Sequence, residues 1–270
     1  MSDQGRLPPT SPDDTGAGAG GSRSRTGTGA NEREELLRLA SVVAHQLKSP
    51  LASVQSVLTT VLGGFAGPID SRQRWLLEKA LERCSKGVDL VRDLLRLRAV
   101  DRLDDETLGP VNLVAAFTAA VDEFTEAARQ HEVQLHSSIE VSDADSAWIH
   151  GDATLVREIL GVLLDNAIKY TPKKGRITAR VLLEAGGGHE TAPRLGVEII
   201  DSGIGIPPEG YEKLFQEFYR APNAKKLAAE GSGLGLAFAW RAVRRLGGTL
   251  EIEPASTGGV RAVAGFSLRP

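Results

Sequence analysis

The chain has 270 residues, of which 41% are hydrophobic and 25% are charged, as in an ordinary globular protein. Its formal net charge of -3 means that the chain has no excess of basic residues, so nucleic acid is not an expected partner. A single cysteine excludes an internal disulfide and a cysteine-based zinc site. No apolar run approaches the ~18 residues of a membrane span and no signal peptide is recognisable, so we predict a cytoplasmic location with no membrane span.

Residues 1–30 are predicted to form a disordered N-terminal tail. They consist mostly of Gly, Ser, Thr, Pro and Asp, with almost no large apolar side chain after Leu7. Such a stretch cannot bury enough surface to offset its chain entropy. A folded sensor module does not fit there, so we expect the input signal to come from a separate sensor protein, from the tail or from a domain outside this sequence.

Residues 31–100 are predicted to form an antiparallel helical hairpin. Apolar residues recur at helical spacing in two runs, joined by Gly63-Gly64 and Gly67-Pro68, and Ser71 is the expected N-cap of the second helix. The stripes are Leu36, Ala40, Val43, Leu47, Val54, Leu58 and Val61, then Leu77, Leu81, Cys84, Val88, Val91 and Leu95. One hairpin leaves half of its stripe in water, so we expect a homodimer that forms a four-helix bundle.

Residues 101–110 read as a polar linker, and residues 111–270 as an α+β sandwich with a mostly antiparallel sheet. Helices are predicted at 113–130, 152–169, 211–218 and 234–246. Strands are predicted at 133–139, 147–150, 176–184, 195–201, 248–253 and 260–268.

The helix expected to begin after an Asp152 N-cap carries polar residues on its inward stripe. After Ile159 and Val162 the stripe continues with Asn166, and Lys169 and Tyr170 lie one turn further on. Polar groups buried there need partners. Two interpretations have about equal weight: the helix emerges into solvent at its end, or the amide oxygen meets a hard cation and the ammonium meets phosphate.

Two glycine-rich loops follow. Asp201 ends an apolar strand and precedes Gly203 and Gly205, an arrangement that could place a carboxylate beside a flat ligand but that, in isolation, more often marks a plain turn. Further on, the run 231–236 opens a helix whose N-terminal amides could bind an anion. A lone Gly-x-Gly-x-Gly is weak evidence by itself.

The order and combination of these motifs carry a resemblance. The runs 165–172, 201–205, 215–220 and 231–235 resemble the four ATP-binding boxes of two-component sensor histidine kinases, in the family's order and spacing. His45-Gln46-Leu47-Lys48-Ser49-Pro50-Leu51 resembles the phospho-acceptor box of the same kinases. The resemblance covers roughly residues 32–270 and implies a transmitter region, in which the hairpin is followed by a GHKL-type ATPase domain with the Bergerat-type ATP-binding fold.

The resemblance implies roles for individual residues. Asn166 would ligate Mg²⁺, Lys169 would contact phosphate, Tyr170 would line the adenine pocket and Asp201 would bind the adenine amino group. Gly203 and Gly205 would shape the base pocket, Gly231, Gly233 and Gly235 would approach the phosphates, and Leu236 joins the ATP-binding set. The segment between the last two boxes would be a mobile lid.

Two positions depart from the family pattern. Val162 replaces an asparagine that the family often has one turn before Asn166, so water or phosphate oxygens would complete the Mg²⁺ shell. Gln46 replaces the usual acidic residue after the histidine; it can orient the imidazole but cannot stabilise an imidazolium by charge. Ser49 matches the position that orients water for dephosphorylation of the partner, although a simple surface hydroxyl is an equally good interpretation.

The function implied by the resemblance is an ATP-dependent histidine kinase. It would autophosphorylate on His45 and pass the phosphoryl group to an aspartate in the receiver domain of a response regulator. The alternatives are a regulatory ATP-binding module of weak activity, favoured by Val162 and Gln46, and a phosphatase-dominant partner of another kinase, which would depend on Ser49.

Overall fold

The computed structural model describes residues 46–47, 49–142, 147–184, 194–227 and 231–268. The predicted tail at 1–30 and the candidate nucleophile His45 lie outside the described residues. No helix of the described ranges has both the length and the apolar character needed to cross a membrane.

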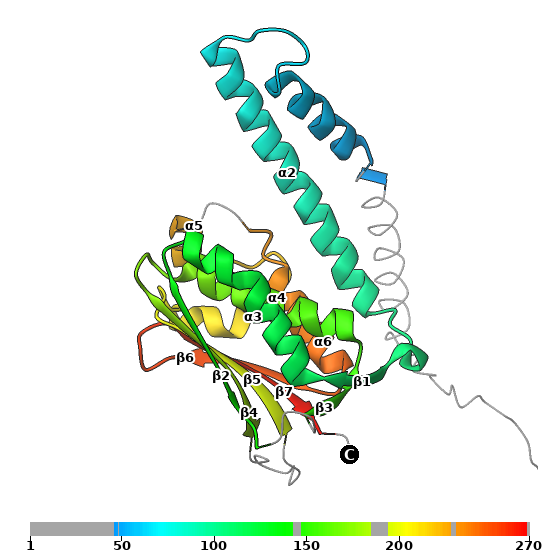
Figure 1. The fold of residues 1–270 in the computed structure, drawn as a ribbon, viewed down its shortest axis with the longest axis vertical. Helices are drawn as coiled ribbons and strands as arrows, with labels where there is room; N and C mark the ends of the chain where they lie inside the picture. Colours follow the sequence, from blue (N-terminus) through cyan, green and yellow to red (C-terminus); the bar gives the residue numbers. More distant parts are fainter. Residues whose placement is uncertain (1–45, 48, 143–146, 185–193, 228–230, 269–270) are drawn as a thin grey trace, which may run out of the picture. The chain divides into compact units, whose positions relative to one another are not determined.

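The hairpin consists of a first helix, described over 46–62 apart from residue 48, and α2 (Ser71–Val100). The two run side by side and are joined by the loop 63–70 (Figure 1). The Gln55 amide donates to the Ser85 hydroxyl at 2.9 Å, and the Cys84 thiol donates to the Leu51 carbonyl at 3.1 Å. Cys84 is buried on the predicted stripe, which confirms its interpretation as a core residue.

The N-cap of α2 was predicted one residue too late. Asp70, not Ser71, caps the helix: its carboxylate accepts the Gln73 backbone N–H at 2.8 Å, and the Gln73 side chain accepts the Asp70 backbone N–H at 2.9 Å. This reciprocal capping box satisfies two N–H groups at once, which a lone serine cannot do.

The remaining elements form two layers. They are η1 (Asp105–Thr107), β1 (Gly109–Asn112), α3 (Leu113–Gln130), β2 (Gln134–Glu140), β3 (Trp148–Gly151), α4 (Ala153–Tyr170), β4 (Arg176–Glu184), β5 (Arg194–Asp201), η3 (Pro208–Lys213), α5 (Pro222–Leu227), α6 (Gly235–Arg245), β6 (Thr249–Pro254) and β7 (Val260–Ser267). Strands β2-β4-β5-β7-β6 make one sheet, in which only β2 and β4 are parallel, and β1 pairs with β3 in a separate ribbon. The predicted mostly antiparallel α+β sandwich is confirmed.

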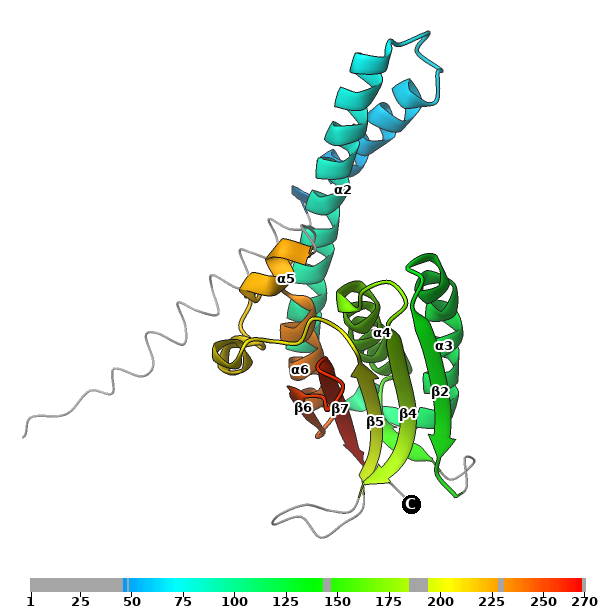
Figure 2. The ribbon, with the colours of Figure 1, turned by 90° about the vertical axis from the view of Figure 1, so that its left-hand side faces the viewer.

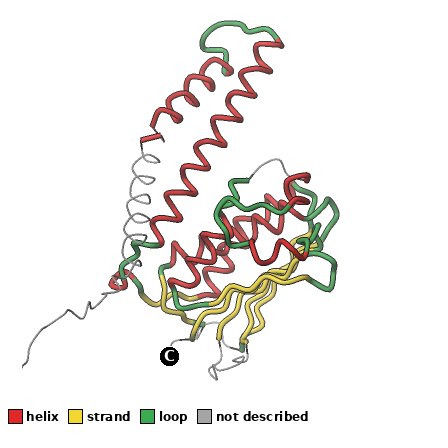
Figure 3. The backbone as a smooth tube through the Cα atoms, turned by 180° about the vertical axis from the view of Figure 1, so that it is seen from behind, coloured by secondary structure: helices red, strands yellow, loops and turns green. Residues whose placement is uncertain are grey.

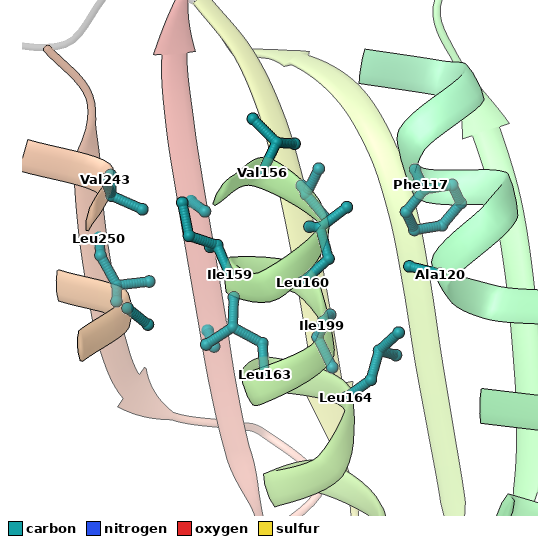
Figure 4. Close-up of a cluster of buried hydrophobic side chains, with 14 of the residues drawn as sticks. Phe117, Ala120, Val156, Ile159, Leu160, Leu163, Leu164, Ile199, Val243 and Leu250 are labelled. Atoms are coloured by element: carbon teal, nitrogen blue, oxygen red, sulfur yellow. The ribbon is translucent and has the colours of Figure 1, made fainter. Parts of the chain in front are cut away.

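The helices α3, α4 and α6 cover one face of the sheet, and the strands and helices separate clearly into layers (Figures 2 and 3). The centre of the core is α4, whose Ile159, Leu160 and Leu164 lie between the sheet and its neighbouring helices (Figure 4). Burying such side chains contributes roughly 1.5–3 kcal/mol each relative to exposure, so this layer holds α4 rigidly. The end of α4 is thereby fixed against β5.

A charge ladder crosses the opposite face of the sheet. Glu198 of β5 is only 1% exposed and accepts hydrogen bonds from Arg180 of β4 and Arg261 of β7. Arg261 also pairs with Glu253 at 2.5 Å, and Arg180 with Glu140 at 3.4 Å. Burial alone would raise the pKa of Glu198, but the two arginines outweigh it and the pKa is lowered.

One predicted helix is wrong and three elements were missed. Residues 211–218 do not form an α-helix: the 3-10 helix η3 ends at Lys213, and Phe218 has a φ of 63°, a left-handed conformation that no α-helix can include. The predicted linker 101–110 contains η1 and the start of β1, which at four residues is too short to show a period. Helix α5, of six residues, was also missed.

Candidate functional site

A cavity of about 1060 Å³ opens between α4, the end of β5, the segment 215–220 and the loop 231–235 before α6. From now on the last of these is called the glycine loop. The cavity brings together nine predicted positions: Asn166, Lys169, Tyr170, Asp201, Gly205, Gly231, Gly233, Gly235 and Leu236. Residues of α2, including Asp93, also line it.

The polar residues of α4 lie at the edge of its buried face. Asp152 caps the helix as predicted, accepting the Leu155 N–H at 2.7 Å. The buried face continues through Leu163, Leu164, Ala167 and Ile168, so Asn166, Lys169 and Tyr170 are half-buried beside it rather than on it. The polar groups of these three side chains therefore face the cavity and not the core.

Asp201 is held so that one carboxylate oxygen is occupied. Its Oδ1 accepts the backbone N–H of Gly203 at 2.7 Å and of Val260 at 3.2 Å. Within the described residues, no hydrogen bond ends on Oδ2, which leaves this atom as an acceptor at the cavity. Burial raises the pKa of Asp201, and the two backbone N–H groups partly offset the shift.

Gly203 does not itself line the cavity, but it contacts two residues that do, Tyr170 and Asp201. A Cβ on Gly203 would lie 2.5 Å from the Tyr170 carbonyl oxygen, so only glycine lets the loop after β5 approach the end of α4. The same residue supplies an N–H to Asp201.

Gly233 is required for a different reason. It has a φ of 72°, and a Cβ there would lie 2.7 Å from the Phe218 backbone carbon. The glycine loop and the segment 215–220 therefore touch through their backbones, which brings both to one wall of the cavity.

Positive charge and helix amides gather at this wall. The Lys169 Nζ and the Arg220 guanidinium lie 2.9 and 3.6 Å from where a Gly231 Cβ would be. Helix α6 begins at Gly235 without a side-chain cap. A capless helix N-terminus beside two cationic side chains can bind an anion.

Helix α2 contacts both loops of this wall. The Ser232 hydroxyl donates to the Asp93 carboxylate at 2.6 Å. Glu217, in the segment 215–220, accepts from Arg98 of α2 at 3.2 Å and from Arg241 of α6 at 2.6 Å. The Arg98 side chain is 10% exposed, so this network is largely buried. The hairpin is thus connected to the cavity through ion pairs and hydrogen bonds.

The two hairpin candidates that the structure describes are not part of the cavity. Gln46 and Ser49 are exposed on the first helix and do not line it. His45 lies outside the described residues. Across the described part of the chain, no group of three or more His, Cys, Asp or Glu residues could hold a metal by itself.

Sequence reasoning missed four contributors: Arg220, Asp93, Thr257 and Gly259. Arg220 ends the run 215–220, but the resemblance assigned it no individual role. Thr257 and Gly259 form part of the turn between β6 and β7, where the Thr257 hydroxyl donates to the Asp201 carbonyl at 2.8 Å. The Thr-Gly-Gly run signals a turn, but no sequence signal joins it to an aspartate more than fifty residues earlier.

Comparison with known proteins agrees with this architecture. Residues 151–270 match the family of histidine kinase-, DNA gyrase B- and HSP90-like ATPases. The circadian input-output histidine kinase CikA of Synechococcus elongatus is 28% identical over 214 residues, covering 79% of this chain and 27% of that protein. The signal transduction histidine-protein kinase/phosphatase MprB of Mycolicibacterium vanbaalenii is 31% identical over 238 residues, covering 85% of this chain and 45% of that protein.

A solved structure shares the fold. The crystal structure of full-length ShkA in complex with AMPPNP aligns with a TM-score of 0.65 at 19% identity, covering 86% of this chain and 46% of that one. The chain spans between about a quarter and about half the length of the curated relatives it matches.

The sheet, its three covering helices and the glycine-walled cavity define an ATPase domain of the histidine kinase, gyrase and HSP90 type. Together with the preceding helical hairpin, they make this chain similar to the transmitter region of two-component sensor histidine kinases.

Proposed function

We propose that the chain is an ATP-dependent protein-histidine kinase that autophosphorylates on His45 and passes the phosphoryl group to an aspartate of a response regulator. The observation that carries the proposal is the polarity of the cavity. Asp201 offers an unoccupied acceptor oxygen at one place, while Lys169, Arg220 and the N-terminus of α6 gather positive charge at the wall by Gly231. A nucleoside triphosphate has the complementary arrangement, with an amino-bearing base and a polyanionic tail.

The base would be adenine. Its exocyclic amine is a donor that Asp201 Oδ2 can accept, whereas guanine presents a carbonyl oxygen at the same ring position, which the carboxylate would repel. Tyr170 and Gly205 line the cavity with Asp201 and would border the ring. Leu236 and Gly235 line it from the start of α6, where the phosphates would meet the backbone amides.

Asn166 fits the role of a Mg²⁺ ligand. Its half-buried side chain reaches the cavity, an amide oxygen suits a hard cation, and the ion commonly takes its other oxygens from water and phosphate. When bound, Mg²⁺ would neutralise charge on the phosphates. Val162 lines the cavity one turn earlier and offers no oxygen, so we expect Asn166 to be the main side-chain ligand from α4.

The phosphoryl group would move to His45. A neutral imidazole nitrogen attacks the γ-phosphorus in line, the bond to the leaving ADP oxygen breaks, and Lys169 with the glycine-loop amides stabilises the charge on the transferring group. Gln46 would orient the ring through its amide oxygen. Ser49 would serve dephosphorylation of the response regulator by orienting the water that attacks its phosphoaspartate and releases inorganic phosphate.

The hairpin would dimerise. Several large apolar side chains of the two helices are exposed in the single chain: Leu47, Val54, Val57, Trp75, Leu76 and Leu90. Pairing two hairpins would remove this surface from water and complete the four-helix bundle. A receiver domain of a response regulator and a separate sensor protein remain the partners we expect, in the cytoplasm.

The proposal is tested by incubating the purified chain with γ-labelled ATP and Mg²⁺, beside a His45→Gln control. We expect acid-labile label on the wild-type chain and none on the control, followed by transfer to an added receiver domain. Binding of ATP without labelling would instead favour the regulatory module of weak activity, which Gln46 and Val162 support. Faster loss of label from a phosphorylated receiver domain, abolished by Ser49→Ala, would favour the phosphatase-dominant alternative.

A further inference from the structure

The turn between β6 and β7, residues 255–259, lies directly against Asp201. The Thr257 hydroxyl donates to the Asp201 backbone carbonyl at 2.8 Å. Immediately after the turn, the Val260 N–H donates to Asp201 Oδ1 at 3.2 Å. The turn is closed on itself by two backbone hydrogen bonds of 3.0 Å between Ala255 and its glycines. The turn and the residue that follows it thus donate hydrogen bonds to both the main chain and the side chain of Asp201.

The approach is closer than a side chain would permit. A Cβ on Gly259 would lie 2.2 Å from the Asp201 carbonyl oxygen and 2.4 Å from its Oδ1. Both contacts are far below van der Waals distance and involve the atoms that set the carboxylate's direction. Any residue other than glycine must therefore displace Asp201 or the turn.

Thr257 is not needed to close the turn between β6 and β7. It is exposed, and its hydroxyl bond leaves the turn for Asp201 instead of serving the turn itself. Its neighbour Ser256 is equally exposed, and no hydrogen bond of its hydroxyl is found within the described residues. The two hydroxyls thus differ in one respect, the contact with Asp201.

We propose that this turn is a positioning element for base selection, with Thr257 and Gly259 as the positioning residues. The turn keeps Asp201 Oδ1 hydrogen-bonded to the Val260 and Gly203 N–H groups. Oδ2 therefore faces the cavity, where it would accept a hydrogen bond from the 6-amino group of adenine. The inference rests on the proposed function of the cleft as an ATP site. It adds that discrimination depends on a turn that does not touch the base.

The test compares ATP with purine riboside triphosphate, which has hydrogen in place of the 6-amino group. The ratio of their dissociation constants reports the Asp201–amine hydrogen bond and cancels the contribution of the phosphates. A hydrogen bond to a charged group changes affinity by about 10-fold or more, so the wild-type full chain should prefer ATP by that factor. Binding is followed by calorimetry in the presence of Mg²⁺.

The turn variants should lower this ratio. Thr257→Val should reduce it about threefold, as expected for loss of one hydrogen bond that acts through another residue, and Thr257→Ser should restore it. Gly259→Ala should bring it near one. Ser256→Ala, the matched loss of an exposed hydroxyl in the same turn, should leave it unchanged. Thermal unfolding of each variant reports whether the domain is folded. If Gly259→Ala does not fold, the result for Thr257→Val alone decides the test.

The outcomes separate the two proposals. If wild type binds neither nucleotide, the proposed ATP site itself is wrong. If wild type binds both equally, the site takes ATP but Asp201 does not read the 6-amino group, and the positioning proposal is overturned. If wild type discriminates but Thr257→Val and folded Gly259→Ala weaken both nucleotides by the same factor, the turn has only a structural role and the positioning proposal is overturned.

Discussion

Asp201→Asn should change which base the cleft accepts, not only how tightly it binds. In the wild type, Oδ1 accepts two backbone N–H groups, at 2.7 Å from Gly203 and 3.2 Å from Val260. An asparagine can keep both only if its carbonyl oxygen takes the Oδ1 position. Its NH₂ group then occupies the Oδ2 position and faces the cleft as a donor.

The direction and size of the effect follow from this forced orientation. A donor facing the 6-amino group of adenine loses a charge-assisted hydrogen bond, which contributes about 1.5–3 kcal/mol. At about 1.4 kcal/mol per factor of ten, ATP should bind about 10- to 150-fold more weakly. Inosine triphosphate, whose 6-oxygen accepts a hydrogen bond, should lose no affinity and should become the preferred ligand.

Calorimetric titration of wild type and Asp201→Asn with the two triphosphates measures this reversal. Asp165→Asn is the matched control, because Asp165 also lines the cavity and its replacement removes the same charge. It should leave the preference for ATP intact. Retention of that preference by a folded Asp201→Asn protein would refute the assigned orientation of the carboxylate.

Three other changes test the surrounding structure. Glu198→Gln should lower the free energy of unfolding by about 2–4 kcal/mol at neutral pH, because it weakens the charged hydrogen bonds from Arg180 and Arg261. Since the folded pKa of Glu198 lies below its ordinary value of 4.5, this advantage is complete above about pH 4.5 and shrinks as the pH falls towards the folded pKa. Urea unfolding of both proteins across that range checks it, and a constant difference would contradict it. Glu217→Ala should cost about 1–3 kcal/mol, because it removes the carboxylate that two arginines share; thermal unfolding without nucleotide measures this, and an unchanged midpoint would show the network to be unimportant. Gln46→Glu should speed autophosphorylation, since a carboxylate can stabilise the imidazolium that glutamine cannot. Single-turnover rates that stay equal or fall would exclude this role of Gln46.

The elements with a strong period were predictable from the sequence. The long apolar stripes of α2 and α4 extend over many turns, and the strands from β4 to β7 are bounded by glycine and polar residues, so local pattern and final structure agree. The cap at Asp152 followed from the same reasoning. The cavity residues on α4 were assigned from the resemblance of the run 165–172 to an ATP-binding box, because the stripe expected to include Asn166 passes through Ala167 instead.

The rest depends on contacts that no local pattern contains. Residues 211–218 have helical composition, yet Phe218 is held in a left-handed conformation where the glycine loop packs against it. The hydrogen bond from Thr257 to Asp201 joins the turn between β6 and β7 to the end of β5. Asp93 reaches Ser232 across 139 positions of the chain. Tertiary packing decides such features, and they gather at the site.

We propose above that one cleft delivers phosphate from ATP to one histidine of the hairpin. The most direct measurement is mass-spectrometric mapping of the phosphorylated residue after single-turnover reaction with Mg²⁺ and ATP, done in parallel with His45→Gln and Asn166→Ala. We expect phosphate on His45 in the wild type and none on that position in either variant. Phosphate on another residue, or undiminished phosphorylation of His45 in Asn166→Ala, would contradict it.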